Sequence, residues 1–153
     1  MDLVPAMRRI RAFEPLPEAD LRVLEKAFNV ESHGDSHVFV REGDRASSAW
    51  LIAEGEVVVT RDRASSVDEI TVLGPGDLFG LIGLVSGRRR SATCTTRGPV
   101  TVGVIDGSAF EWLLDTHAPM GHALQRAVAE QLARDYRQIQ AHLVAELERR
   151  SAR

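Results

Sequence analysis

Residues 73–93 read LGPGDLFGLIGLVSGRRRSAT. This stretch combines a glycine-rich turn, a short apolar segment and an Arg-Ser-Ala-Thr sequence that begins a predicted strand. A glycine followed by a single helical turn leaves backbone N–H groups without partners inside the helix, and such groups attract anions. The stretch therefore predicts a cradle for one phosphate group.

Arg90 is the first candidate for a phosphate contact in this cradle. Its guanidinium is a planar, permanently charged donor whose geometry suits phosphate oxygens. In the run Arg88-Arg89-Arg90, only Arg90 lies directly before Ser91, so we expect Arg88 and Arg89 to face solvent. The predicted phosphate contacts are Gly80, Leu81, Ile82, Gly83, Arg90 and Ser91.

Short runs of β-branched residues, separated by turn signals, surround the cradle. The runs are 38–40, 50–52, 57–59, 70–72 and 100–105, and the turns centre on Gly43, Gly55, Gly74, Gly76 and Gly98. Residues 61–69 are polar and predict a hairpin loop. Short strands at regular spacing are typical of a sandwich or barrel rather than a parallel α/β sheet. The pattern predicts a mainly β fold with flanking helices.

Helical patterns precede and follow the predicted strands. One begins at Leu16-Pro17-Glu18, and another begins at Asp106-Gly107-Ser108 and is broken by Pro119. A long helix is expected from about Met120 to Arg150, with an apolar residue every three or four positions. These residues are Leu124, Val128, Leu132, Tyr136, Ile139, Leu143 and Leu147. We expect its first half to pack on the barrel and its second half to form a homodimer by pairing with the same helix of another chain.

Length and composition exclude several other classes. A chain of 153 residues is expected to form one domain, with helices over 1–29, a β-roll over 30–105 that contains the cradle at 79–93, and helices over 106–153. The net charge of −3 argues against nucleic acid as a partner. No apolar run reaches the roughly 20 residues of a membrane span, and the N-terminus lacks a signal-peptide core. A single cysteine, Cys94, excludes an intrachain disulfide, so we expect a cytoplasmic protein.

Residues 38–59, VFVREGDRASSAWLIAEGEVVV, resemble the cyclic nucleotide-binding domain family, which includes the catabolite activator protein and the regulatory subunits of cAMP-dependent kinase. The resemblance rests on Gly43-Asp44, Trp50, Ile52, Gly55 and Val57. It continues through GPGDLFG at 74–80 and RSAT at 90–93, and it covers about 16–147. It implies a β-roll or jelly-roll barrel with an N-terminal helix, a short phosphate-cradle helix and a long C-terminal helix. It also implies a non-enzymatic sensor or regulatory module that binds cAMP at Arg90.

Leu81 departs from the family pattern. Members that bind cAMP tightly read Phe-Gly-Glu here, and their glutamate accepts hydrogen bonds from the ribose 2′-hydroxyl, whereas this chain reads Phe79-Gly80-Leu81. A hydrogen bond to a charged group contributes roughly 1.5–3 kcal/mol, so its loss weakens binding by about ten- to a hundredfold or more. Without the acid the empty pocket is also more positive. The expected ligand is cAMP, another cyclic nucleotide or another anion.

The base-binding half of the site is less clear from the sequence. Members of the family close over the base with the C-terminal helix and with apolar strand residues. Possible base contacts are Val72, Thr93, Arg134, Arg137, Gln138 and Ile139. The two arginines are equally compatible with solvent-facing positions, and Cys94 is expected to be a small buried residue rather than a redox sensor.

Transcription factors of this family carry a helix-turn-helix domain after the long helix. This chain ends at residues 151–153, so we expect the signal to leave through dimerisation or through a separate effector protein. An alternative is a degenerate domain that no longer binds nucleotide and serves in protein–protein interaction or dimerisation. A third possibility, a cupin-type metal enzyme, rests only on His33, His37 and Glu42. We expect no metal site, no resident cofactor and no catalytic constellation.

Overall fold

The computed structural model describes residues 1–63, 65–116 and 118–152; Ala64 in the expected hairpin loop, His117 in the expected C-terminal helical region and Arg153 at the chain end lie outside the described residues. In chain order the elements are α1 (Val4–Met7), the 3-10 helix η1 (Arg11–Phe13), α2 (Glu18–Glu25), β1 (Asn29–His33), β2 (Val38–Val40), β3 (Ser48–Asp62), β4 (Val67–Leu73), β5 (Leu78–Phe79), α3 (Leu81–Ser86), β6 (Thr93–Asp106), α4 (Gly107–Leu114) and α5 (Pro119–Ser151).

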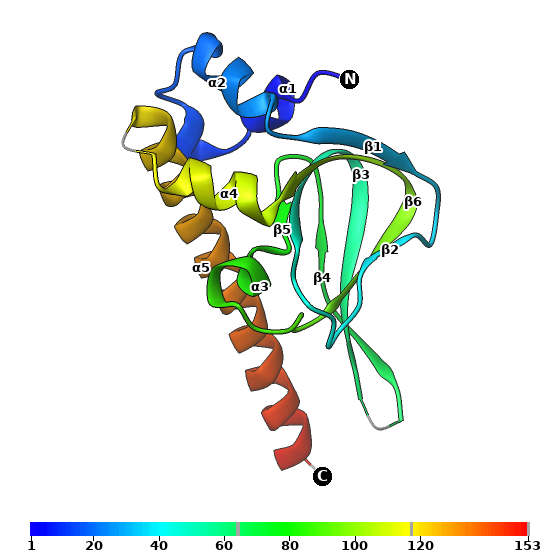
Figure 1. The fold of residues 1–153 in the computed structure, drawn as a ribbon. Helices are drawn as coiled ribbons and strands as arrows, with labels where there is room; N and C mark the ends of the chain where they lie inside the picture. Colours follow the sequence, from blue (N-terminus) through cyan, green and yellow to red (C-terminus); the bar gives the residue numbers. More distant parts are fainter. Residues whose placement is uncertain (64, 117, 153) are drawn as a thin grey trace.

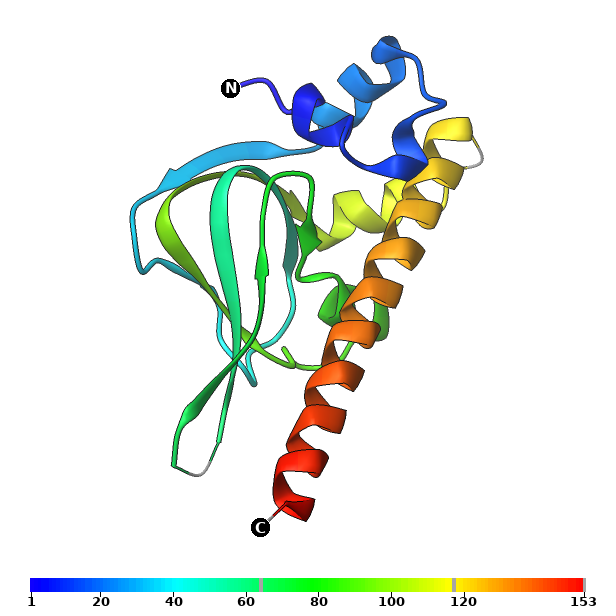
Figure 2. The same cartoon turned by 180° about the vertical axis from the view of Figure 1, so that it is seen from behind.

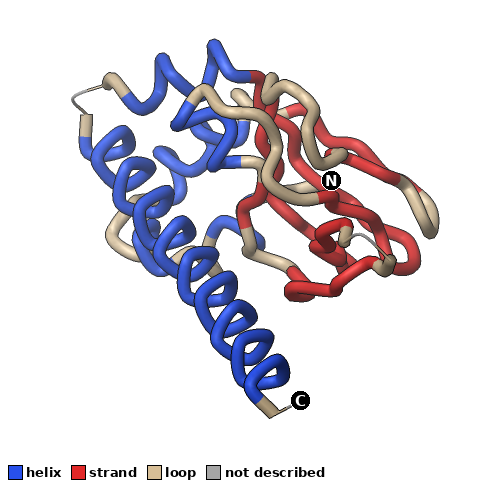
Figure 3. Tube along the Cα trace, turned by 90° about the horizontal axis from the view of Figure 1, so that it is seen from below, coloured by secondary structure: helices blue, strands red, loops and turns tan. Residues whose placement is uncertain are grey.

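The strands form one six-stranded antiparallel sheet that curls into a roll (Figure 1). Strands β1, β6, β3 and β4 are neighbours in that order, while β2 pairs with β6 and β5 pairs with β3. β3 and β6 pair from Ser48 opposite Asp106 to Thr60 opposite Thr93. Figure 3 places the helices together on one side of the molecule and the strands on the other. The predicted mainly β fold with flanking helices is confirmed.

The sequence prediction was wrong about the turns at Gly55 and Gly98. β3 continues through Gly55 and β6 through Gly98, so the predicted runs 50–52 and 57–59 belong to one strand. The pairing shifts register between Ile52 and Glu56 instead of ending. Gly55 has φ of 90°, and a Cβ there would lie 2.4 Å from the Pro99 carbonyl oxygen. Glycine therefore allows the long strand to bend inside a continuous ladder, as a bulge does.

The helices and the roll enclose two apolar cores. One lies between the helices and the sheet, and the other lies inside the roll around Trp50 and Phe79. The short helices α1 and η1, which lie within the region 1–29 expected to be helical, supply Met7 and Phe13 to the first core, and Leu3, directly before α1, is buried with them. In the first half of α5, Leu124 and Val128 are buried there as expected.

The direction of α5 brings part of this helix alongside the roll. It passes the N-terminal helices and then runs beside the roll toward the hairpin formed by β3 and β4 (Figure 2). The hairpin loop is shorter than predicted, because β3 extends to Asp62 and β4 begins at Val67. Within residues 1–63, 65–116 and 118–152, no helix combines the length and the apolar character needed to cross a membrane.

A row of rings connects the edge of the roll to its inner core. The imidazoles of His33 and His37 stack with their centroids 3.7 Å apart, and both contact Phe39 edge-on. Phe39 in turn contacts Phe79, which stacks on Trp50 at 5.1 Å. Burial lowers the pKa of His37, and the neighbouring His33 lowers it further, against an opposing effect of Glu31. The folded protein therefore favours neutral His37.

We expect stability to fall as the pH drops below the ordinary histidine pKa of 6.5. Because folding lowers the pKa of His37, the unfolded chain binds the proton more tightly, so this contribution is complete above pH 6.5 and is lost as the pH falls through the folded pKa. Urea denaturation at pH 7.5 and 5.5 measures the effect. His37→Gln should reduce the pH dependence, whereas His122→Gln, at an exposed position on α5, should preserve it. An unchanged pH dependence in His37→Gln contradicts the prediction.

Candidate functional site

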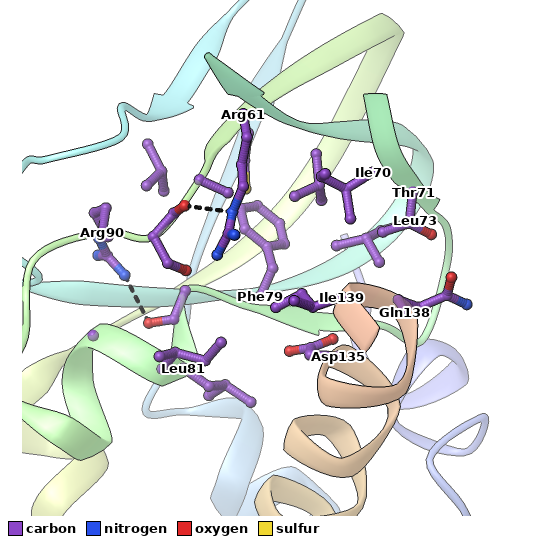
Figure 4. A pocket seen from close by; sticks show the side chains of 18 residues that line it. Arg61, Ile70, Thr71, Leu73, Phe79, Leu81, Arg90, Asp135, Gln138 and Ile139 are labelled. Carbon is purple, nitrogen blue, oxygen red and sulfur yellow. Dashed lines mark hydrogen bonds between the residues drawn. The ribbon is translucent and has the colours of Figure 1, made fainter. Parts of the chain in front are cut away.

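A pocket lies between the roll, α3 and α5 (Figure 4). It holds about 690 Å³ of space not filled by protein atoms, part of which is open to solvent. This is the size range of small-molecule sites, and most of the lining is apolar, as is usual for such sites. The lining residues are Val40, Val59, Arg61, Ile70, Thr71, Leu73, Phe79, Gly80, Leu81, Ile82, Gly83, Arg90, Ser91, Ala92, Cys94, Asp135, Gln138 and Ile139.

The structure brings all the predicted phosphate contacts to this pocket. These are Gly80, Leu81, Ile82, Gly83, Arg90 and Ser91. α3 begins directly after Gly80, so the first N–H groups of this helix have no partner within it. Gln138 and Ile139, two of the possible base contacts, line the pocket from α5.

The remaining possible base contacts do not reach the pocket. Successive residues of a strand point to opposite faces, so Thr71 and Leu73 face the pocket while Val72 is exposed. The Thr93 hydroxyl accepts a hydrogen bond from the Glu42 backbone N–H at 3.0 Å. Its neighbour Cys94 takes the pocket-facing position instead.

The two arginines named as possible base contacts, Arg134 and Arg137, lie on the exposed side of α5. Arg134 donates a hydrogen bond to the Gln131 side chain at 2.9 Å, and Arg137 is exposed. Of the two positions considered for these arginines, the structure shows the solvent-facing one. Both are outside the residues that line the pocket.

Arg90 is buried and held by the backbone on several sides. Only 7% of the residue is exposed. One terminal nitrogen donates to the Gly80 carbonyl oxygen at 2.7 Å, and the other donates to the Ser48 carbonyl oxygen at 2.8 Å. The guanidinium carbon lies 5.3 Å from the centroid of the Trp50 ring, within cation–π range. The described residues thus surround this cation with carbonyls and a ring, and none of these partners is a carboxylate.

The main chain of Arg90 explains the Gly43-Asp44 motif. The Arg90 N–H donates to the Asp44 carbonyl oxygen at 2.7 Å, and the Gly43 N–H donates to the Arg90 carbonyl oxygen at 2.9 Å. The Gly43-Asp44 turn therefore holds the backbone of Arg90 in place.

Burial shifts the pKa of Arg90 and that of Cys94, but Arg90 remains a cation and Cys94 remains a neutral thiol. Loss of water lowers the pKa of Arg90, and Cys94 and Asp44 oppose that effect. Arginine nevertheless remains charged in proteins. Burial raises the pKa of Cys94 to about 12, against an opposing effect of Arg90. Cys94 is therefore a buried neutral thiol, and thiols are unreactive in that form.

Leu81 serves both the core and the pocket. It is 2% exposed and belongs to the core between the helices and the sheet, and it also lines the pocket. The surface beside Arg90 at this position is therefore apolar. A hydroxyl of a ligand placed against Leu81 finds no acceptor in its side chain.

The sequence analysis missed two charged residues that line the pocket, Arg61 and Asp135. The Arg61 Nε donates to the Ser91 carbonyl oxygen at 3.0 Å. Burial raises the pKa of Asp135, while a hydrogen bond from Gln131 at 3.1 Å opposes the shift. Helical spacing was a usable signal for Asp135, since it lies four residues before Ile139 on the face that meets the roll.

Gln131 attaches α5 to the cradle. Its side chain is almost fully buried, and its carbonyl oxygen accepts a hydrogen bond from the Leu78 backbone N–H at 3.1 Å. Leu78 belongs to β5, which leads directly into Gly80 and α3. The helix wall of the pocket is thus joined to the strand that begins the cradle.

The proposed metal trio does not assemble. His33 and His37 stack face to face, and the His33 ring contacts Glu31 at 3.0 Å. Glu42 instead accepts a hydrogen bond from the Asp62 backbone N–H. In the part of the chain that the structure describes, no three His, Cys, Asp or Glu residues are grouped to hold a metal ion. The trio therefore gives no basis for a cupin-type enzyme.

Comparison with known proteins gives consistent matches. The family model of the cyclic nucleotide-binding domain matches residues 31–117. The chain is 32% identical over 115 residues to the cAMP-dependent protein kinase type II regulatory subunit of Drosophila melanogaster, an alignment that covers 74% of this chain and 29% of that protein. It is 31% identical over 130 residues to the cAMP-dependent protein kinase regulatory subunit of Dictyostelium discoideum, with coverage of 82% and 37%. The chain thus spans less than half the length of these relatives.

The fold also matches a solved structure. A cyclic nucleotide-binding domain from Methylobacillus flagellatus superposes with a TM-score of 0.83 at 21% identity. The superposition covers 94% of this chain and 82% of that chain. The long C-terminal helix and the roll are therefore part of a shared fold.

We expect Gly80→Ala to destabilise the protein more than Gly87→Ala. Both glycines flank α3 and have positive φ, 82° and 67°. A Cβ at Gly80 would lie 2.8 Å from the Trp50 ring and 3.0 Å from an Arg90 nitrogen, whereas nothing lies within 4 Å at Gly87. The extra crowding should cost about 1–3 kcal/mol in the free energy of unfolding, measured with urea. Equal losses in the two variants contradict the prediction.

Proposed function

Because the chain belongs to the cyclic nucleotide-binding domain family, we propose that it is a non-enzymatic sensor or regulatory module that binds cAMP or a related cyclic nucleotide in the pocket between Arg90 and α5. The phosphate would lie at Gly80–Gly83 with Arg90 and Ser91. The base would contact Gln138 and Ile139. We place this function in the cytoplasm, where the single cysteine stays reduced.

The observation that carries this proposal is the buried charge of Arg90. A buried cation is costly unless it is paired, and the described residues satisfy Arg90 with neutral carbonyls and the Trp50 ring. A guanidinium has five N–H donors, so further donors remain for a ligand. An anion that enters the pocket supplies the missing negative charge.

We also propose that the affinity for cAMP is weakened at the ribose. Leu81 offers an apolar surface where the tightly binding members of the family have an acid. The loss of one charge-assisted hydrogen bond corresponds to about tenfold or more in affinity.

Calorimetric titration with cAMP and cGMP tests the proposal. Wild-type protein should bind one of them, and Arg90→Lys, which keeps the charge but loses the planar fork, should weaken binding by about tenfold or more. Arg90→Ala should abolish it. Arg88→Ala is the matched control, because Arg88 is exposed outside the pocket, and its affinity should stay within about threefold of wild type. Circular dichroism verifies that each variant is folded.

A wild-type protein that gives no heat with either nucleotide contradicts the binding function. That result would favour the alternative, a domain that has lost nucleotide binding and serves in protein–protein interaction. In that case the exposed surface of α5 would be the candidate interaction site.

The second half of α5 presents its apolar residues to solvent. Tyr136, Leu143 and Leu147 recur on one face of the helix and are 65%, 56% and 54% exposed. The face that meets the roll instead carries polar residues such as Asp135 and His142. A surface helix normally turns its apolar stripe inward. We therefore propose that a second copy of this chain covers the outer stripe and that a separate effector receives the signal from the dimer.

Sedimentation equilibrium tests the dimer. The double variant Leu143→Glu/Leu147→Glu should be monomeric where the wild type is dimeric, because two carboxylates would be buried in the shared stripe. Val23→Glu, an equivalent change at an exposed apolar residue of α2, should leave the dimer intact. A monomeric wild type, or a dimer that persists in the double variant, contradicts the proposal.

A further inference from the structure

Arg61 extends from the end of β3 into the same pocket as Arg90. Its Nε donates to the Ser91 carbonyl oxygen at 3.0 Å, which directs the guanidinium toward the cradle. Figure 4 shows its side chain reaching into the space between Arg90 and the α5 residues Asp135 and Ile139. The pocket is therefore flanked by one cation near the end of β3 and another in the loop between α3 and β6.

The two guanidiniums are used differently. Both terminal nitrogens of Arg90 already donate to backbone carbonyls, at Gly80 and Ser48. The terminal nitrogens of Arg61 make no hydrogen bond or ion pair with any residue that the structure describes, and its only side-chain bond is through Nε. Arg61 therefore has more donors available to a bound molecule than Arg90 has.

The other charges around the pocket do not neutralise Arg61. Asp135 is the one acid among the lining residues, and its carboxylate accepts a hydrogen bond from Gln131. Leu81, next to Gly80, adds no negative charge. With Arg61 and Arg90 set against Asp135, the described lining has an excess of positive charge. A leucine at position 81 also removes the repulsion that an acid would exert on a second anionic group.

We propose that Arg61 is a second anion contact and that the preferred ligand is a nucleotide with two phosphate-borne negative charges. This inference rests on the proposed function only in using the same pocket for the nucleotide. One phosphate oxygen would lie at Arg90 and α3, and a second charged oxygen would bind the terminal nitrogens of Arg61. A cyclic monophosphate shares a single charge between its two free oxygens, so it balances only one of the two cations.

Ring-opened forms of cAMP provide matched probes. 3′-AMP and 5′-AMP carry the same base and sugar as cAMP, but at pH 7.5 their phosphates approach a charge of −2, since the second pKa of a phosphate monoester is about 6. In calorimetry at low salt, wild-type protein should bind the better of these two at least about tenfold more tightly than cAMP. A wild type that binds cAMP more tightly than either monophosphate overturns the inference.

Variants at Arg61 test the role of its charge. Arg61→Gln should weaken binding of the monophosphate by about tenfold or more and binding of cAMP by less than about threefold. Arg61→Lys keeps the charge and should retain the preference for the monophosphate. Arg41→Gln, the same charge change at an exposed arginine outside the pocket, should affect both ligands by less than about threefold. Thermal unfolding of each variant verifies the fold.

The outcomes separate this inference from the proposed function. If Arg61→Gln weakens both ligands equally, or if Arg61→Lys behaves like Arg61→Gln, then Arg61 only positions the Ser91 backbone and the inference fails. If cAMP binds and depends on Arg90 while Arg61 has no effect, the inference fails and the proposed function stands. If none of the three nucleotides binds, the inference fails, and if cGMP also gives no heat, the proposed function fails with it.

Discussion

The buried charge of Arg90 is the constraint on which the cradle depends. A guanidinium inside the protein must be surrounded by acceptors, and here the carbonyls of Gly80 and Ser48 fill that role. Those two bonds join the start of α3 to the start of β3. The Trp50 ring lies over the same cation, which leaves no space for a side chain at Gly80. One buried charge therefore explains both the aromatic residue at position 50 and the glycine at position 80.

The position of α5 is linked to the pocket for a physical reason. Gln131 binds the backbone of β5, and further along the helix Asp135 and Ile139 form one wall of the pocket. Near its end, Glu146 pairs with Arg63 of the hairpin at 2.9 Å, and Arg63, followed by Arg149, lowers the pKa of Glu146 to about 2. The helix is thus attached to the roll at both ends of the pocket. A ligand that contacts both the roll and α5 therefore influences the position of α5 relative to the roll.

The sequence predicted the order of elements, and it also singled out the glycine turn and the Arg90-Ser91 pair that line the pocket, because both depend on local signals. Glycine turns, β-branched runs and the Arg90-Ser91 pair are readable without knowing which residues meet in space. The wrong turn at Gly55 shows the limit, since a glycine that bends a strand and one that ends it look alike in sequence. Val72, a possible base contact, lies outside the pocket lining for a similar reason, because the face that a strand residue occupies depends on the strand register. Arg61 reaches the pocket because the end of β3 pairs with the start of β6, with Thr60 opposite Thr93, and a pairing between segments so far apart in the chain is not readable from local patterns.

Leu81 and Arg61 together determine the charge balance of the pocket. Considered alone, Leu81 is a loss, since it removes an acceptor for a sugar hydroxyl from an otherwise intact cradle. In the folded chain it is also the apolar surface beside a pocket that two arginines border and that one aspartate only partly balances. An acid at that position would offset the excess positive charge, whereas leucine leaves it available to a ligand. Under the proposed mode of binding, the same leucine removes one ribose contact and favours a more highly charged nucleotide.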